Sequence, residues 1–274
     1  MVDDAASVYA RARLYDRAAP VYDHVGPRIF SRFGERLVEL AHLASDARVL
    51  DVATGRGAIL FPASAQIQRG QIIGVDLSEP MLRETQAEIK PRGVSNVALA
   101  RMNGEILACA DSSFDQLLCG FAIFWLPHLE IALNEFHRVL RSAGRLGISM
   151  SGGPDARWQW YRDLLRQNDK RYHIFEDTGS TVNGKPDELR AALMRSGFSD
   201  IETTIETFDI VYANEDEWWS AQWMHGSRLP LEKFSPNVLE QFKADAFEGI
   251  QALKKSDGFH EAWHVVFALA RKSD

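Results

Sequence analysis

The segment Arg48-Val49-Leu50-Asp51-Val52-Ala53-Thr54-Gly55-Arg56-Gly57 decides how this sequence is interpreted. Its first half is a short apolar run interrupted by one acidic residue, which is typical of a buried parallel strand. Two glycines follow, where the chain must turn tightly and let its backbone approach a ligand. A helix is predicted directly afterwards, over residues 58–68. The segment therefore predicts a strand, a ligand-binding loop and a helix, in that order.

The same alternation continues along the first half of the chain. Ser78 and the early Pro80 predict the start of a second helix, because both residue types favour helix N-termini. Further strands are expected at residues 71–76, 97–101, 114–121 and 145–149, with a helix over residues 129–140. This rhythm predicts a parallel sheet with helices on both faces and right-handed crossovers.

The second half predicts two closing strands and a cap. Residues 201–212 and 262–270 are rich in β-branched and aromatic residues, which favours strands. We expect an α/β, Rossmann-like fold with a seven-stranded, mostly parallel sheet, helices on both faces and a mainly helical cap. The whole chain, 1–274, is predicted to be a single domain, with cap segments at about 1–45, 154–185 and 214–258.

The amino-acid composition and net charge limit the kinds of partner that the protein can bind. Hydrophobic residues make up 46% and charged residues 25% of the chain, as in an ordinary globular protein. The net charge of −7 and the lack of a basic block argue against nucleic acid. No signal peptide or membrane span is predicted, and Cys109 and Cys119 lack metal or redox spacing. We therefore expect a cytoplasmic protein with a small-molecule partner, no metal, no nucleic acid and no stable membrane insertion; a homo-oligomer stays open.

Asp76 strengthens the interpretation of the loop as a nucleotide-like site. It ends the second predicted strand, 25 residues beyond Asp51, where a carboxylate can bind both hydroxyls of a ribose. The alternative is an ordinary strand-end Asp that caps a helix. The third glycine of the dinucleotide fingerprint is missing, which counts against a pyrophosphate ligand and a nicotinamide-dependent oxidoreductase.

Residues 15–149 resemble the class I S-adenosylmethionine-dependent methyltransferases, of the ubiquinone/menaquinone-biosynthesis type and their natural-product relatives. The resemblance rests on six stretches of the chain. They are Tyr15-Asp16-Arg17-Ala18-Ala19-Pro20-Val21-Tyr22-Asp23, Val49-Leu50-Asp51-Val52-Ala53-Thr54-Gly55-Arg56-Gly57, Gly74-Val75-Asp76-Leu77-Ser78-Glu79-Pro80-Met81-Leu82, Met102-Asn103-Gly104-Glu105, Ser113-Phe114-Asp115 and Glu135-Phe136-His137-Arg138-Val139-Leu140-Arg141-Ser142-Ala143-Gly144.

This resemblance implies a set of cofactor contacts. Asp51 is expected to hold the methionine amino group of S-adenosylmethionine, and Asp76 the ribose hydroxyls. Asn103 is expected to face the adenine amino group; related proteins usually carry Asp there, and the Asn carbonyl oxygen can still accept a hydrogen bond. The other expected cofactor-binding residues are Ala53, Thr54, Gly55, Gly57, Leu77, Met81, Gly104, Glu105, Cys119 and Phe121.

Methyl transfer from a sulfonium is an in-line displacement, so alignment and water exclusion are expected to supply most of the catalysis. A general base is required only for a weakly acidic acceptor. Tyr15 and Tyr22, seven residues apart on one face of an N-terminal arm, are the favoured catalytic candidates because such an arm would screen the sulfonium from water. His128 and His225 are the candidate bases; the alternative for His128 is a capping role, and His24, His173 and His264 are less favoured.

The expected cap is rich in aromatic residues, which suit a lipophilic acceptor. Trp125, Trp158, Tyr161, Trp219 and Trp223 are predicted to line the acceptor pocket, although such residues also serve as packing. The predicted function is methylation of a small, lipophilic or aromatic metabolite of specialised metabolism. The alternatives are a quinone-precursor C-methyltransferase and a methyltransferase-fold enzyme that catalyses cyclisation or isomerisation with the cofactor as a bound electrostatic element.

Overall fold

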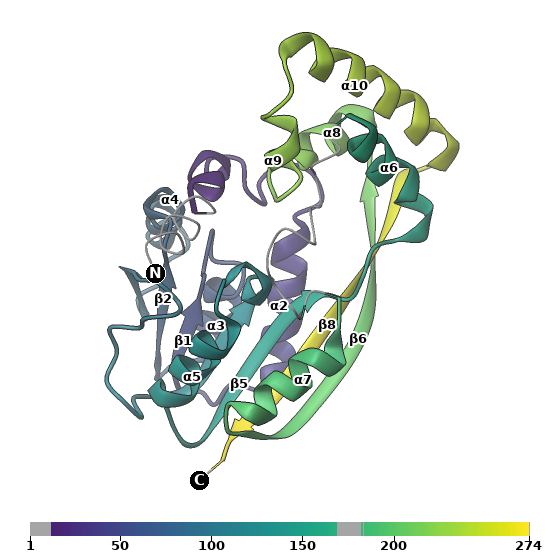
Figure 1. Cartoon of the computed structure of the whole chain (residues 1–274). Coiled ribbons are helices and arrows are strands. Elements are labelled where there is room, and N and C mark those ends of the chain that lie inside the picture. Colours follow the sequence, from purple (N-terminus) through teal and green to yellow (C-terminus); the bar gives the residue numbers. More distant parts are fainter. Residues whose placement is uncertain (1–11, 169–181, 183, 274) are drawn as a thin grey trace.

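The computed structural model describes residues 12–168, 182 and 184–273 (Figure 1). Its centre is a mixed sheet with the strand order β3-β2-β1-β4-β5-β8-β6, and β7 pairs with β8 at one end. The strands are β1 (Arg48–Val52), β2 (Gln71–Asp76), β3 (Val97–Arg101), β4 (Phe114–Gly120), β5 (Leu140–Ser151), β6 (Phe198–Tyr212), β7 (Lys254–Lys255) and β8 (Gly258–Lys272). Strands β1 to β5 are parallel and β8 is antiparallel to both its neighbours, so the predicted fold class is confirmed.

Helices cover both faces of the sheet. On one face α2 and α3 pack over a core that contains Val49, Leu118 and Phe267; on the other, α5 and α7 cover a core that contains Leu50 and Leu146. The helices are α2 (Ile29–Ala41), α3 (Leu60–Gln66), α4 (Glu79–Ile89), α5 (Leu129–Val139), α6 (Gln159–Asn168), α7 (Pro186–Arg195), α8 (Glu215–Gln222), α9 (Arg228–Leu231) and α10 (Pro236–Ile250), with short 3-10 turns at Ile123–Trp125, Ala156–Trp158 and Gln251–Leu253. None of the described helices is long and apolar enough to cross a membrane.

The first three strands have the bounds that the sequence predicts, whereas β5 and β8 are longer. β5 starts at Leu140, where the sequence predicts the end of a helix and a turn. Leu140 pairs with Phe114, and a register shift before the next pair accommodates the extra residues. Ala143 takes a left-handed conformation there, at φ 56°. A bulge therefore replaces the predicted break.

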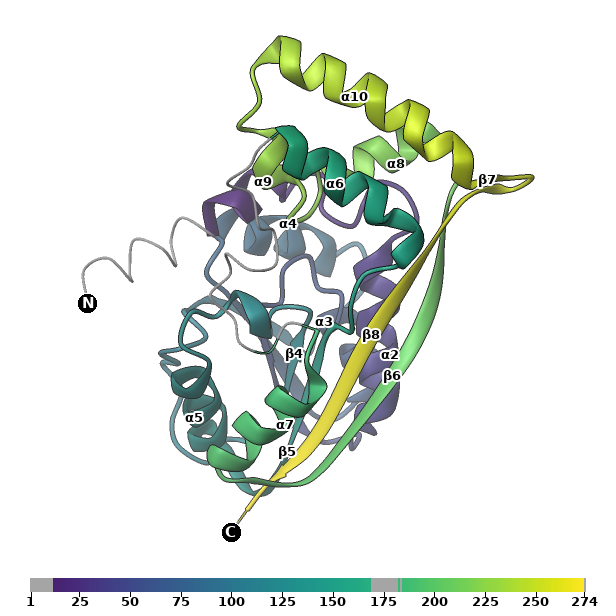
Figure 2. The ribbon, with the colours of Figure 1, turned by 45° about the vertical axis from the view of Figure 1, so that its right-hand side comes forward.

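Strands β6 and β8 continue beyond the sheet as a two-stranded ribbon. β5 ends where Ser151 pairs with Val265, but β8 goes on pairing with β6 as far as Phe259 opposite Tyr212. The cap helices α8, α9 and α10 lie between these strands in the sequence, at the end of the ribbon (Figures 1 and 2). The ribbon extends past the carboxyl end of β5, so it holds the cap above the edge where parallel strands present ligand sites.

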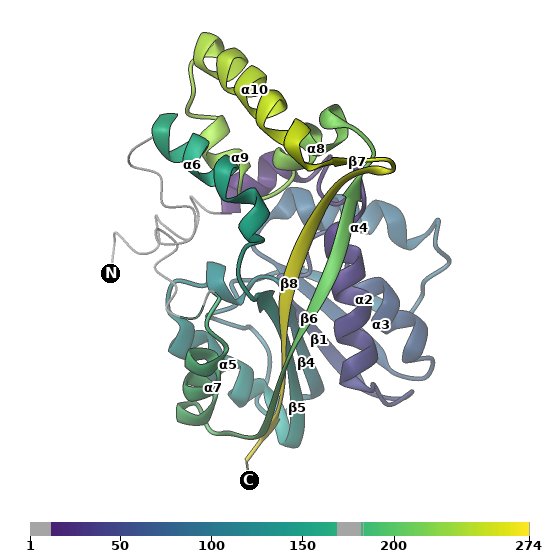
Figure 3. The same ribbon diagram turned by 90° about the vertical axis from the view of Figure 1, so that its right-hand side faces the viewer.

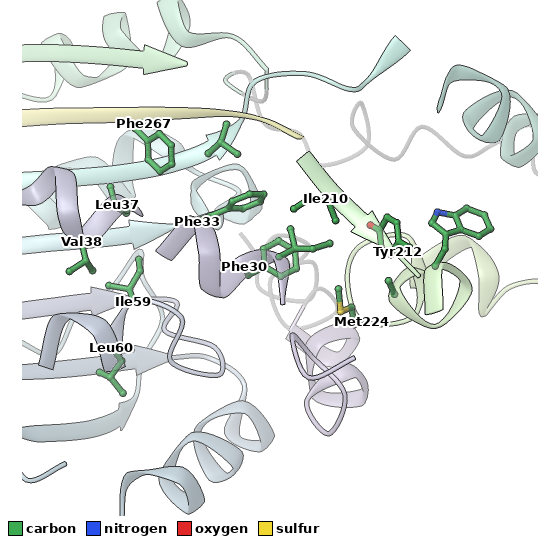
Figure 4. Packing of buried hydrophobic residues seen from close by; sticks show 14 of the residues in the cluster. Phe30, Phe33, Leu37, Val38, Ile59, Leu60, Ile210, Tyr212, Met224 and Phe267 are labelled. Carbon is green, nitrogen blue, oxygen red and sulfur yellow. The ribbon is translucent and has the colours of Figure 1, made fainter. Parts of the chain in front are cut away.

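Helix α2 belongs to the body of the fold, although the sequence places it in the first cap segment. Figure 3 shows α2 lying along the sheet beside α3, and Phe33, Leu37 and Val38 are buried in the core between them (Figure 4). Asp23 fixes the start of this helix, because its carboxylate accepts hydrogen bonds from the backbone N–H groups of Phe30 and Ser31 at 2.9 and 2.7 Å. Of the described part of the first predicted cap segment, residues 12–28 are left to cover the site.

The contact between α2 and the start of α3 leaves no room for a side chain at Gly34. A Cβ atom there would lie 2.2 Å from the carbonyl oxygen of Ala58. We expect Gly34→Ala to lower the free energy of unfolding by about 1–3 kcal/mol, because the backbones must move apart. Urea denaturation measures this change, with the exposed Glu35→Ala in the same helix as control. Equal stability of the two variants would contradict the predicted close packing.

Candidate functional site

The loop after β1 is held in a conformation that suits a ligand against its backbone. Ala53, Gly55 and Gly57 all have positive φ angles, of 57°, 51° and 80°. The hydroxyl of Thr85 donates to the carbonyl oxygen of Gly55 at 2.7 Å, and the N–H of Thr54 donates to the Val75 carbonyl oxygen at 3.0 Å. Two of these three residues are glycines, which adopt this conformation without strain.

Asp76 connects this loop to the start of α4. One carboxylate oxygen accepts from the N–H of Gly55 at 2.8 Å, and the other accepts from the N–H of Ser78 at 2.8 Å. Ser78 then caps α4, since its hydroxyl accepts from the N–H of Met81. Asp76 also lines a pocket, so its remaining lone pairs are available to a ligand's hydroxyl groups.

Asp51 is a buried carboxyl with one oxygen left over. Oδ2 accepts from the Thr54 hydroxyl at 2.6 Å, whereas Oδ1 has no hydrogen-bond partner in the described part of the chain. Burial, with a smaller contribution from Asp76, raises the pKa of Asp51 to about 7. A buried acceptor without a hydrogen bond costs about 1–3 kcal/mol of folding free energy. A cationic ligand group that donates to Oδ1 would remove this cost.

Two adjoining pockets bring most of the predicted cofactor residues together. Asp51 and Thr54 line the smaller pocket, beside Phe30 and Gly120. Ala53, Gly55 and Phe121 line both pockets, and Asp76, Leu77, Met81 and Asn103 line the second. The Oδ1 atom of Asn103 already accepts from the N–H of Glu105 at 3.0 Å, which leaves one lone pair for a ligand.

Four predicted cofactor residues lie outside these pockets. Cys119 is fully buried in the core on the far side of the sheet, because alternate residues of a strand face opposite ways. Its neighbour Gly120 lines the pocket in its place. Gly104 packs behind the site, where a Cβ would meet Val52 at 3.0 Å, and Gly57 faces the ring of Phe61. Glu105, the fourth, binds the backbone N–H of His128 at 2.7 Å.

The N-terminal arm, residues 12–28, covers the pockets with two tyrosines. Tyr22 stacks on Phe30 at a centroid distance of 5.1 Å, and Tyr15 packs edge-on against Tyr22 at 5.9 Å and Trp125 at 5.6 Å. Burial raises the pKa of both tyrosines, so their hydroxyls stay neutral at physiological pH. Phe121, at the end of β4 with φ 52°, also contacts Phe30.

The arm is bound to the body and to the cap. The Ser78 hydroxyl donates to Asp16 at 2.6 Å, and Arg56 donates to the carbonyl oxygen of Ala19 at 2.8 Å. Arg17 forms an ion pair with Glu232, next to α9 of the cap. The arm therefore bridges the two parts of the molecule that border the site.

A third, larger pocket lies under the cap and shares Tyr15, Tyr22, Phe121 and Trp125 with the cofactor-side pocket. The predicted residues Trp158 and Tyr161 line it. Trp219 and Trp223 do not: Trp219 packs against Trp223, Phe242 and Phe247 within the cap. Trp218, another aromatic residue of the predicted cap, also lines the pocket, as do residues that were not predicted, among them Phe30, Phe124, Gln222, Glu261 and Trp263.

Of the histidines, His225 alone lines the pocket among the described residues. Its Nδ1 accepts from the N–H of Ser227 at 3.3 Å, and its buried Nε2 has no hydrogen-bond partner in the described part of the chain. Burial lowers the pKa of His225 to about 4, so the ring is neutral at pH 7. His128 precedes α5 and contacts Glu105, outside the pockets. His24 pairs with Glu88 and His264 with Thr207, while His173 lies outside the described residues.

Comparisons with known proteins agree with this geometry. Residues 49–144 match a family described as a methyltransferase domain. The nocamycin O-methyltransferase of Saccharothrix syringae is 27% identical, in an alignment that covers 94% of this chain and 97% of that protein. A demethylmenaquinone methyltransferase of Lactiplantibacillus plantarum is 34% identical over 54% of this chain and 67% of its own. Among solved structures, phosphoethanolamine N-methyltransferase 2 of Haemonchus contortus, with S-adenosylhomocysteine bound, is 18% identical, with a TM-score of 0.56 over 88% of this chain and 52% of its own.

Fold, site and relatives together define a class I methyltransferase. The chain belongs to the S-adenosylmethionine-dependent methyltransferases, and S-adenosylmethionine is its cofactor. The described residues fit that molecule: Asp76 presents a carboxylate beside a pocket, and the unpaired Oδ1 of Asp51 matches the ammonium group of a methionine.

Asp76 offers a direct test of the cofactor site. We expect Asp76→Ala to weaken S-adenosylhomocysteine binding at least about tenfold, because hydrogen bonds to a charged group contribute about 1.5–3 kcal/mol each. Isothermal titration calorimetry measures the affinity. Glu79→Gln is the matched control, because this carboxylate lies three residues away on the exposed side of α4. Unchanged affinity in Asp76→Ala would rule out the assigned role.

The raised pKa of Asp51 predicts proton-linked binding. Below about pH 7 the free chain holds a proton on Asp51, whereas an ammonium group requires the ionised carboxylate. Cofactor binding should therefore release a proton, and affinity should rise with pH up to about 7. Calorimetry at pH 6 in two buffers of different ionisation enthalpy detects that proton. Asp51→Asn should abolish the release; an equal release in this variant would assign it to another group.

Proposed function

We propose that this enzyme methylates a small, lipophilic or aromatic metabolite of specialised metabolism. The observation that carries the proposal is the aromatic pocket under the cap, which joins the cofactor-side pocket at Tyr15, Tyr22, Phe121 and Trp125. An acceptor in this pocket would meet the cofactor along that shared wall. Pockets of this composition suit largely apolar ligands with a few polar groups.

The relatives favour natural products over quinone precursors as acceptors. The nocamycin O-methyltransferase aligns over 94% of the chain, so its similarity extends into the cap segments. Two demethylmenaquinone methyltransferases align over less of it, 54% and 72%. Since the cap supplies much of the acceptor pocket, the longer alignment is the more informative about the acceptor.

Different residues would bind the methionine, ribose and adenine parts of the cofactor. Asp51 would accept from the methionine ammonium group, and Asp76 from the ribose hydroxyls. Leu77 and Met81 would pack beside the adenine, with the Asn103 side chain near its amino group. Gly55 and Gly120 would allow close backbone approach at the methionine end.

The bound cofactor supplies an electrophilic methyl group, which passes to an acceptor lone pair as the carbon–sulfur bond breaks and S-adenosylhomocysteine forms. The chain would contribute alignment and a dry site. Tyr15 and Tyr22 would close the arm side of the pocket, and their neutral hydroxyls would not act as bases. Phe30 and Phe121 would continue this wall, since Phe30 stacks on Tyr22 and contacts Phe121.

His225 would bind the acceptor as a hydrogen-bond donor. Its Nδ1 accepts from the Ser227 N–H, so the proton of the neutral ring is on Nε2. In this tautomer the ring cannot take a proton from the acceptor. Its ring adjoins Phe30 and Trp263 at centroid distances of 6.3 and 6.0 Å, close to where the pockets meet. An acceptor oxygen that ionises readily would suit such a donor.

We further propose that the enzyme acts in the cytoplasm and without nucleic acid. Cys109 and Cys119 are free, which is typical of a reducing compartment. The net charge of −7 would repel a phosphate backbone.

The proposal is tested with S-adenosylmethionine that carries a trideuterated methyl group. Incubation with a panel of polyketide, terpenoid and indole metabolites should give a product heavier by one labelled methyl, detected by mass spectrometry. A rearranged product of unchanged mass would favour the cyclisation or isomerisation alternative. Methylation of demethylated quinones alone would favour quinone-precursor chemistry.

Two variants of Tyr22 distinguish a role in shielding the site from water from a role in proton transfer. We expect Tyr22→Ala to lower kcat at least about tenfold, because the opened wall admits water and releases the acceptor from alignment. Tyr22→Phe keeps the stacking on Phe30 and should remain close to the wild type. Steady-state rates of S-adenosylhomocysteine formation measure both. A large loss in Tyr22→Phe would instead indicate a chemical role for the hydroxyl.

A further inference from the structure

Glu261 is one of three charged residues, with Asp155 and Arg162, among the described residues that line the acceptor pocket. Glu261 of β8 lines the pocket, two residues before Trp263 on the same face of the strand. The neighbouring wall is formed by large aromatic side chains, among them Trp158, Tyr161 and Trp218. Glu261 therefore places a carboxyl group among aromatic rings, on a wall whose other charged residues are Asp155 and Arg162.

This carboxyl group is held in a fixed orientation. The hydroxyl of Tyr212 donates to Oε2 of Glu261 at 3.0 Å. Tyr212 is fully buried at the end of β6, and its backbone pairs with Phe259, two residues before Glu261. The partner strand thus orients one oxygen of this carboxyl group.

The charged neighbours of Glu261 are engaged elsewhere. Asp155 forms an ion pair with Arg157 at 2.6 Å and accepts from the N–H of Ala262 at 2.9 Å. Arg162 donates to the side-chain oxygen of Gln159 at 2.7 Å. Within the described part of the chain, Glu261 forms no ion pair. Burial raises the pKa of Glu261 to about 7, against the lowering effect of the Tyr212 hydroxyl that donates to it.

Glu261 lies toward the end of the pocket that is remote from the cofactor. Trp263 contacts Phe30 and Phe121 at centroid distances of 6.2 and 5.9 Å, and both phenylalanines border the cofactor-side pockets. Glu261 is about 7 Å further along β8, on the part of the ribbon that rises beyond β5 toward the cap. It is therefore placed to contact the far end of an acceptor whose reacting atom lies near Phe121.

We propose that Glu261 is a specificity-determining residue, which selects acceptors that carry a hydroxyl or ammonium donor at the end opposite the methylated atom. This inference rests on the proposed function and narrows its substrate class. Tyr212 satisfies one oxygen of this carboxyl group, and a ligand donor would bind the other. The same carboxyl would disfavour an acceptor with an anionic group at that end.

The test uses the full chain saturated with S-adenosylhomocysteine and three aromatic probes of similar size. They are 2-naphthylmethanol, 2-naphthylmethylamine and 2-(methoxymethyl)naphthalene, and the methyl ether lacks a donor. Calorimetry should show at least one of the first two binding about tenfold or more tighter than the ether, the range expected for a hydrogen bond to a carboxylate. Tighter binding of the amine identifies an ammonium site, and tighter binding of the alcohol a hydroxyl site.

Three variants show whether the preference depends on Glu261. Glu261→Leu should bind the three probes with equal affinity, and Glu261→Gln should lose the preference for the amine first. Tyr212→Phe keeps the carboxyl but frees its bound oxygen, and should reduce the preference without removing it. Glu202→Gln, an exposed carboxylate on β6, is the matched control and should leave the preference unchanged.

The outcomes separate this inference from the proposed function. Unaltered melting temperature and S-adenosylhomocysteine affinity in the variants exclude misfolding. Equal affinity of the wild type for all three probes, or no binding of any, would overturn the role of Glu261, as would an unchanged preference in Glu261→Leu. Failure of the wild type to bind S-adenosylhomocysteine would contradict the cofactor site itself.

Discussion

The antiparallel pairing of β6 with β8 is the constraint on which the arrangement of the site depends. It runs from Phe198 opposite Lys272 to Tyr212 opposite Phe259, well beyond the end of β5. The hydrogen bonds of this ribbon hold the cap helices above the carboxyl edge of the sheet. They also orient Glu261 and Trp263 toward the pocket, since both residues face the same side of β8. Without the ribbon, the cofactor loop would border an open edge.

The cofactor and acceptor sides of the site meet at a small group of aromatic rings. Tyr22 stacks on Phe30, which contacts Phe121 and His225. These rings come from the arm, from the first turn of α2, from the end of β4 and from the cap. The cofactor side has a buried acceptor without a described partner, Oδ1 of Asp51, and the acceptor side has buried nitrogens without one, Nε2 of His225 and Nε1 of Trp263. Opposite hydrogen-bonding character on the two sides suits two different ligands.

Local patterns in the sequence were sufficient to predict the sheet and most of the cofactor loop. Short apolar runs that end in Asp51 and Asp76 fix the strands, and strand ends place both carboxylates at one edge. Cys119 failed as a pocket residue because a shift of one position along a strand reverses the face, and Gly120 takes that place. Bounds of β5 were wrong because a bulge, rather than a turn, absorbs Ala143.

The acceptor side was less predictable because it depends on tertiary packing. Trp218 lines the pocket while its neighbour Trp219 packs inside the cap, a distinction set by how α8 lies on the ribbon. Glu261 was missed because the predicted strand began at Ala262. A signal was present: Phe259, Glu261 and Trp263 alternate with period two, so the acidic residue falls on an aromatic face.

The way the cap is inserted has a consequence for how such enzymes diversify. Residues 213–257 leave the fold at Tyr212 and return beside it, because Tyr212 and Phe259 are paired. A segment whose two ends are fixed side by side can change in length and sequence without displacing the strands that hold it. The cap can therefore change in length and sequence while the sheet and the cofactor loop stay as they are, and under the proposed function such changes would alter the choice of acceptor.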